Sequence, residues 1–306
     1  MNENVGISSV WASSELGSGN ELLRKLKDTG IRAYELEYRI TYSILNEIIP
    51  HIKSEEITIL SIHNFFPTPL IKGIPRPSGD AFLLSSKNES ERRKAVDETL
   101  RTLEYAAQFN AKAVVVHLGH IEMESSFEKF RSYYDEKKVG SKVWKDFYEE
   151  MKSEREKLSP YHLESVLKSL EEILVCLPEG VKLGIENRNY FHQIPDFKEM
   201  KIICNSFVDE KIGYWHDCGH AKVQENMKWS KTSDWLREFG GRLVGIHLHD
   251  CEGYSDHQAP GVGEVDFREL LPFLKNDILK ILEIKPSVSL GELKGGLDFL
   301  RQIGIL

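Results

Sequence analysis

The sequence predicts one α/β domain, spanning residues 1–306, in which eight parallel strands alternate with helices and close into a (β/α)8 barrel. Three observations indicate this fold. Short apolar, β-branched runs recur along the chain, and amphipathic helical patterns separate them. The runs are continuously apolar, which is typical of parallel strands with both faces covered. Eight such units favour a closed barrel over an open sheet.

The expected elements follow one another in a regular order. Strands are expected where the apolar runs lie, at residues 5–11, 33–38, 57–65, 113–118, 181–186, 211–216, 243–249 and 280–284. Helices are expected where apolar residues recur at three- and four-residue spacing. These patterns cover residues 20–28, 42–53, 89–109, 159–176, 195–207, 232–239, 266–274 and 291–303.

Two segments are longer than a minimal barrel needs. Residues 67–80, "PTPLIKGIPRPSGD", follow the third strand, and their proline and glycine content indicates a loop that can cover a pocket. Residues 120–158, after the fourth strand, are charged and aromatic and predict a helical insertion. This insertion either packs over the barrel mouth or forms a solvated helix with no role in ligand binding.

The composition, 41% hydrophobic and 29% charged, is that of a globular protein with a large core. A net charge of −8 and a pI near 5.8 give no long-range attraction for a phosphate backbone, so nucleic acid is not an expected partner. Scattered cysteines without a C-x-x-C pair are typical of reduced thiols. The first residues do not resemble a signal peptide, and no apolar run reaches membrane-spanning length. We therefore expect a cytoplasmic protein without a membrane partner.

Polar side chains gather at the ends of six consecutive expected strands, the third to the eighth. In a (β/α)8 barrel these ends meet at one mouth, where catalytic groups lie. A lone buried histidine is more often structural, but buried ionisable groups on six neighbouring strands need opposing charge or a metal. The strand-end residues are Ser61, His63, Asn64, His117, His120, Glu186, Asn187, Arg188, His216, Asp217, His220, His247, His249, Asp250, Glu283 and Lys285.

Glu186, Asp217, His247 and Glu283, from the fifth to eighth strand ends, form the candidate metal site. Three carboxylates and one imidazole make an oxygen-rich set that suits Mn²⁺, Zn²⁺ or Mg²⁺ and leaves positions open for substrate. A divalent metal is therefore the expected cofactor. Asp250 is expected to orient one of these ligands.

Four segments, "IENRN", "HDCGHA", "IHLHD…HQAPGVGEVDF" and "LEIKP", occur in this order. Together they closely resemble the xylose-isomerase-like TIM-barrel superfamily, which includes sugar isomerases and epimerases, inosose dehydratases and endonuclease IV. The resemblance runs from about the third strand to the C-terminus. It implies that Glu186, Asp217, His247 and Glu283 bind the metal. It also implies that Glu186 and Glu283 are the catalytic pair that transfers protons.

The resemblance also implies a wider set of residues for substrate or additional metals. The endonuclease branch has an aspartate where this chain has Ser255, and Asp256 lies one place away. This departure argues against a full three-metal site. The residues implied to bind substrate or a further metal are His63, His117, His220 and His257. Arg188 follows the strand-five glutamate and is expected to supply positive charge for substrate binding.

The resulting functional prediction is a divalent-metal-dependent isomerase or epimerase of a small sugar, or of a sugar-like polyol or keto compound. It would transfer protons through a metal-bound enediolate. One alternative is an endonuclease IV-like phosphodiesterase with several zinc ions, which His63, His117 and His257 favour and the acidic charge disfavours. Another is a barrel that binds a sugar without turning it over. The sequence is also compatible with a homo-oligomer.

Overall fold

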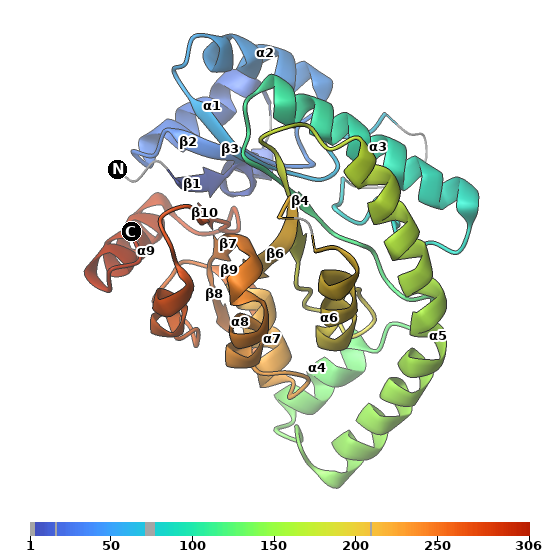
Figure 1. The fold of residues 1–306 in the computed structure, drawn as a ribbon. Helices are drawn as coiled ribbons and strands as arrows, with labels where there is room; N and C mark the ends of the chain where they lie inside the picture. Colours follow the sequence, from blue (N-terminus) through green and yellow to red (C-terminus); the bar gives the residue numbers. More distant parts are fainter. Residues whose placement is uncertain (1–3, 16, 71–76, 209) are drawn as a thin grey trace.

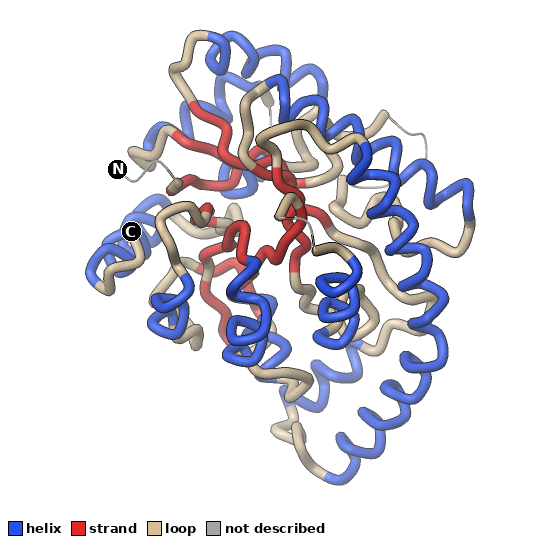
Figure 2. The backbone as a smooth tube through the Cα atoms, in the orientation of Figure 1, coloured by secondary structure: helices blue, strands red, loops and turns tan. Residues whose placement is uncertain are grey.

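Eight parallel strands close into a barrel in a computed structural model that describes residues 4–15, 17–70, 77–208 and 210–306 (Figures 1 and 2). The strand order around the barrel is β1-β10-β7-β6-β5-β4-β3-β2. The predicted (β/α)8 fold is therefore confirmed. The strands are β1 Val5–Ser8, β2 Ala33–Leu36, β3 Thr58–His63, β4 Ala113–Val116, β5 Lys182–Glu186, β6 Ile212–Asp217, β7 Leu243–Leu248 and β10 Leu279–Leu282.

The helices form a ring around the barrel, as Figure 1 shows. Most begin at a side chain that accepts a hydrogen bond from the first helical turn, such as Ser18, Thr41 and Asn88. Asp196 and Ser289 form complete capping boxes. The helices in predicted places are α1 Gly19–Asp28, α2 Tyr42–Lys53, α3 Glu89–Gln108, α6 Phe197–Ser206, α8 Thr232–Phe239 and α9 Leu290–Gln302.

The segment after β4 is helical, as expected, but its second helix is longer than predicted. Helix α4 spans Phe127–Asp135, and α5 runs without a break over Lys142–Val175, so the helix expected at 159–176 is only its second half. Pro160 lies inside α5. Arg155 and Ser159, which both precede the proline, are bonded to Glu199 of α6.

Three further elements differ from the prediction. Helix α7, Cys218–Asn226, was not expected, because it is buried on most sides and lacks an amphipathic pattern. The helix expected at 266–274 is instead the 3-10 helix η3, Phe267–Phe273, which contains Pro272. Strands β8, Asp250–Glu252, and β9, Ser255–Gln258, form an antiparallel hairpin where only a loop was expected.

No helix in the described ranges combines the length and the apolar character that crossing a membrane would require. All four cysteines, Cys176, Cys204, Cys218 and Cys251, are free thiols.

The barrel interior is filled around one large ring, Trp215 of β6, which is fully buried. Two glycines make room for it: a Cβ on Gly245 would lie 2.3 Å from the Trp215 ring, and one on Gly184 would lie 2.8 Å from it. The ring centroid of Trp215 is 5.0 Å from that of His247. Trp215 therefore forms the floor beneath the strand-end residues.

Substituting Gly245→Ala is expected to lower the free energy of unfolding by about 2–3 kcal/mol, because the added methyl group overpacks the barrel interior. Chemical denaturation measures the effect. The matched control is Gly295→Ala in α9, where nothing lies within 4 Å of the added Cβ. The free energy of unfolding of this control should rise by about 0.5–1 kcal/mol, because alanine has a higher helix propensity than glycine. Equal stability of Gly245→Ala and wild type would show that the Trp215 ring moves without cost.

Candidate metal centre

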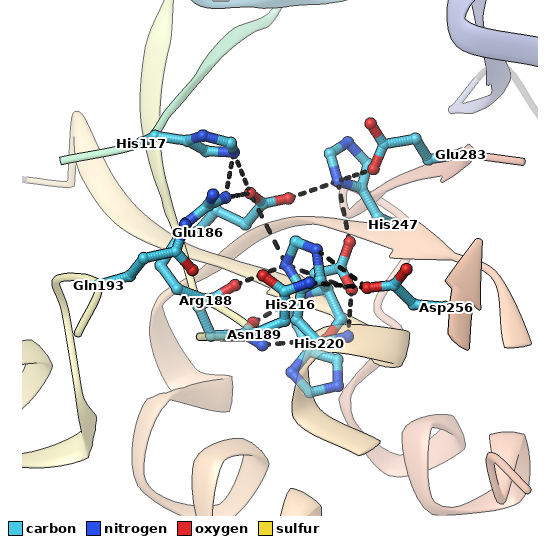
Figure 3. A network of polar contacts seen from close by, with 12 residues as sticks. His117, Glu186, Arg188, Asn189, Gln193, His216, His220, His247, Asp256 and Glu283 are labelled. Atoms are coloured by element: carbon cyan, nitrogen blue, oxygen red, sulfur yellow. Dashed lines mark hydrogen bonds and ion pairs between the residues drawn. The ribbon is translucent and has the colours of Figure 1, made fainter. Parts of the chain in front are cut away.

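Glu186, Asp217, His247 and Glu283 converge at the mouth of the barrel, and each offers a ligand atom within 4.8 Å of the others. The Nδ1 atom of His247 lies 2.7 Å from Oε1 of Glu186, 3.0 Å from Oε2 of Glu283 and 3.5 Å from Oδ2 of Asp217. All four side chains are buried. Figure 3 shows Glu186 and Glu283 reaching His247 from opposite sides. The four residues predicted as metal ligands are therefore brought together.

The strand register explains why these residues meet. Glu186 of β5 is level with Trp215 of β6, and Asp217 of β6 is level with His247 of β7. Glu283 directly follows the last residue of β10, which pairs with β7. Adjacent parallel strands thus deliver all four side chains to one layer at the C-terminal end of the barrel.

The electrostatics of this set call for a positive charge at its centre. Burial alone would raise the pKa of Glu186, but hydrogen bonds with His117 and His247 outweigh it and hold the pKa well below its ordinary value. Burial alone would lower the pKa of His247, but Glu283 and Glu35 raise it well above its ordinary value. A cation can supply the same charge as a proton on Nδ1, so the donor set fits a divalent metal.

Glu35 of β2 lies beneath the set and was missed by the sequence analysis. Its Oε2 atom is 3.2 Å from Nε2 of His247, and it accepts a hydrogen bond from Ser61 at 2.8 Å. Nε2 of His247 therefore faces a carboxylate while Nδ1 faces the three candidate ligands, an arrangement that fixes the imidazole ring for metal binding. The signal was available in "AYELEY", where Glu35 and Glu37 share one face of a short strand.

His63 and His117 form a second group with Glu186, again with ligand atoms within 4.8 Å. Nε2 of His117 is 2.7 Å from Oε2 of Glu186. The Arg188 guanidinium reaches the same place, because Nη1 contacts Nε2 of His117 and lies 2.7 Å from Oε2 of Glu186. Nη2 of Arg188 is 3.2 Å from Oδ2 of Asp80. The positive charge expected from Arg188 is thus present in the site, between carboxylates.

His220, Asp256 and His257 form a third group within 4.8 Å, on the other side of the central set. The shift from Ser255 to Asp256 argued against a full three-metal site, but Asp256 still lies beside the two histidines. His257 has a positive φ of 55°, so neighbouring residues of the β9 strand both turn toward His220. Asn189 donates a hydrogen bond to Asp256 at 2.8 Å and fixes it there.

His249 and Asp250 support the site in different ways. Nε2 of His249 lies 2.8 Å from Oδ2 of Asp217, and Nδ1 accepts a hydrogen bond from the His257 backbone N–H. His249 therefore orients Asp217. Asp250 was expected to orient a ligand but instead accepts hydrogen bonds from its own loop. Its donors are the backbone N–H groups of Cys251, Gly261, Gly263 and Val265.

Glu37, two residues after Glu35 and directly after the end of β2, is fully buried. Burial raises its pKa to about 7, although the charge of Arg39 opposes the shift. The stability that a neutral Glu37 contributes is full below its unfolded pKa, near 4.5, and is lost as pH rises through 7. Between the unfolded pKa and the folded pKa of Glu37, the free energy of unfolding of the wild type should therefore fall by up to about 3 kcal/mol relative to that of Glu37→Gln.

Urea denaturation of the metal-free wild type and of Glu37→Gln across this pH range measures the difference between their free energies of unfolding. The other titrating groups are the same in both proteins, so their contributions cancel in this difference. Parallel pH profiles for the two proteins would contradict a raised pKa at Glu37. Glu252→Gln, an exposed carboxylate in β8, is the control and should follow the wild type throughout.

A closed parallel barrel with buried, metal-capable carboxylates and histidines at its C-terminal mouth defines a recognised class of protein. The chain belongs to the xylose isomerase-like TIM barrel family, whose model matches residues 23–303.

Two relatives from Methanocaldococcus jannaschii are similar in sequence. The uncharacterized protein MJ1311 is 25% identical over 195 residues, which cover 62% of this chain but only 56% of the relative. The uncharacterized protein MJ1614 is 25% identical over 224 residues, 72% of each chain.

Solved structures agree with the barrel fold. A D-tagatose 3-epimerase-like protein superposes with a TM-score of 0.68 at 20% identity, covering 98% of this chain and 96% of that one. The IolI protein with a binding zinc atom gives a TM-score of 0.62 at 14% identity, covering 98% and 97%. At these identities the likeness establishes the fold.

Proposed function

We propose that the protein is a divalent-metal-dependent isomerase or epimerase of a small carbohydrate-like substrate. The observation that carries the proposal is the placement of Glu186 and Glu283 on opposite sides of His247, within one metal-capable set. An epimerase needs a proton-transfer group on each face of the reacting carbon, and an isomerase needs at least one. The sugar epimerases among the structural neighbours support the same class of reaction.

Glu186, Asp217, His247 and Glu283 would hold the metal, and their oxygen-rich set suits Mn²⁺, Zn²⁺ or Mg²⁺. When bound, a divalent cation stabilises negative charge that develops on substrate oxygens. The zinc atom bound in the structure of the IolI protein supports a metal in this chain.

Proton transfer falls to the two glutamates. Hydrogen bonds from His117 and Arg188 keep Glu186 ionised, so it is ready to accept a proton from a substrate carbon next to a carbonyl. Glu283 lies across the set, 3.7 Å from Nδ1 of His257, and would deliver or accept a proton on the opposite face. His220, with Nδ1 facing the Asn187 carbonyl, would hold a substrate hydroxyl.

A multi-metal phosphodiesterase is a second candidate, and one observation favours it. Three further groups lie around the central set among the described residues: His63–His117–Glu186, His220–Asp256–His257 and His249–His257–Glu283. Metals on both sides would activate water and neutralise a phosphate. The guanidinium of Arg188 already lies between His117 and Glu186, which favours the single-metal proposal.

Metal analysis and deuterium exchange separate these functions. The isomerase or epimerase proposal expects about one divalent ion per chain, whereas the phosphodiesterase expects about two or three. The metal-loaded protein should exchange a substrate C–H in deuterated water during a screen of ketoses and inososes. If the protein binds two or three metal ions, hydrolyses bis-p-nitrophenyl phosphate and exchanges no substrate C–H, the phosphodiesterase function replaces the isomerase or epimerase proposal. Sugar binding with neither activity would indicate a non-catalytic barrel.

A further inference from the structure

The end of β2 contributes a cation to the barrel mouth that the proposed chemistry does not use. Arg39 follows Glu37 and Tyr38, and Nη1 of Arg39 donates to Oε2 of Glu37 at 2.8 Å. The Arg39 Cζ atom lies 4.7 Å from the centroid of the Tyr38 ring. Tyr38 in turn packs edge-on against His63, with ring centroids 5.4 Å apart. A buried carboxylate and an aromatic ring therefore hold this guanidinium in one orientation.

One edge of the Arg39 guanidinium remains open. Nε and Nη2 have no acceptor among residues 4–15, 17–70, 77–208 and 210–306, and the side chain is 35% exposed. These two N–H groups form a planar edge that matches two oxygens of a carboxylate or phosphate. Arg188 differs, because it is buried and its Nη1 and Nη2 atoms already contact Glu186 and Asp80, which leaves only Nε without a partner among the described residues. Arg39 therefore has an exposed pair of N–H donors that an external anion can reach.

The strand register places the end of β2 beside the candidate metal centre, and Arg39 lies in the turn that follows β2. Ser8 of β1 is level with Glu35 of β2, and Ile7 is level with Leu282 of β10, the residue before Glu283. Glu35 and Glu283 therefore share a layer. Glu37 and Arg39 lie two and four residues further along the chain, toward the rim of the mouth.

We propose that Arg39 is an anion subsite and that the substrate carries a phosphate or carboxylate group remote from its reacting carbons. This inference rests on the proposed function, because it names the substrate class for the same site. The metal-binding set would hold the reacting end of the substrate, and the Nε–Nη2 edge of Arg39 would hold the other end. In a mouth lined by Glu35, Glu37 and Glu283, an anion needs such a fixed cation to bind at all.

Arginine-specific modification tests the subsite without turnover. In the Mg²⁺-loaded full-length protein, phenylglyoxal should modify Arg39, and 50 mM phosphate or acetate should slow that modification about fivefold or more. Peptide mass spectrometry reports each arginine separately, and exposed Arg93 of α3 is the internal control whose rate should not change. Protection by phosphate alone assigns a phosphate group, and protection by acetate assigns a carboxylate. No protection of Arg39 by either anion overturns the proposal.

Binding of inorganic phosphate provides a second measurement. Arg39→Gln should weaken phosphate binding to the Mg²⁺-loaded protein about tenfold or more, whereas Arg93→Gln should stay within about twofold of wild type. Equal phosphate affinity in Arg39→Gln and wild type would also overturn the proposal. Neither readout depends on catalysis, so absence of C–H exchange would remove the proposed reaction and leave the anion subsite standing.

Discussion

Glu186→Gln is expected to abolish metal binding at the central set and to reduce turnover by about 10³-fold or more, because it removes a ligand and a proton-transfer group together. The amide nitrogen of the variant would also face donors, since Oε2 of Glu186 now meets His117 and Arg188. Elemental analysis of the purified variant measures the first effect, and deuterium exchange measures the second.

A second variant and a matched control accompany this experiment. Glu283→Gln should show the same loss, because Glu283 is the other member of the proposed pair. Glu252→Gln changes an exposed carboxylate in the nearby β8 strand and should keep both metal and activity. Circular dichroism establishes that each variant is folded. Undiminished activity in both Glu186→Gln and Glu283→Gln would eliminate the proton-transfer pair.

Arg155→Met is expected to lower the free energy of unfolding by about 3–5 kcal/mol, since it removes the charged partner of the buried Glu199 carboxylate and the donor to two backbone carbonyls. Nη2 of Arg155 is 2.6 Å from Oε2 of Glu199 and 3.0 Å from the Gln193 carbonyl, and Nη1 is 2.8 Å from the Phe191 carbonyl. Burial already raises the pKa of Glu199 against the opposing charge of Arg155. Arg155 thus joins α5, α6 and the β5–α6 loop.

Denaturant titration measures this loss. Arg237→Met is the matched control, because Arg237 is exposed and pairs only with Asp234, and it should change stability by less than about 0.5 kcal/mol. The double variant Arg155→Met/Glu199→Gln should recover part of the loss by removing the stranded charge. A single variant as stable as wild type would show that the carbonyls and Glu199 find other donors.

The parts of the site that could be predicted are those that depend on local position. A polar residue at the end of an apolar strand must lie at the barrel mouth once the fold is known, and this is how Glu186, Asp217, His247 and Glu283 could be identified. Glu35 was missed because "AYELEYR" alternates charged and apolar residues and resembles a half-exposed strand. Its environment, inside a closed barrel, is set by β1 and β3.

The remaining differences also arise from contacts between distant segments. Asp256 joins His220 because of the left-handed conformation at His257, which residue spacing alone does not reveal. In helix α7 polar residues such as His220 and Gln224 are buried together with apolar ones, so the periodicity of an exposed helix is absent. The helix predicted from residue 159 begins at Lys142 instead, because α5 continues without a break through Pro160.

The insertion after β4 has a consequence for how such a protein can diversify. Helix α4 and the first half of α5 pack through aromatic side chains onto the loop after β5, the α7–α8 connection and the β8–β9 hairpin. The contacts include Phe130 on Phe191 and Trp229, and Tyr134 on Tyr254. None of these contacts involves Glu186, Asp217, His247 or Glu283. Exchanging this segment between homologues should therefore reshape the rim and change substrate selectivity, while the chemistry at the barrel mouth is inherited intact.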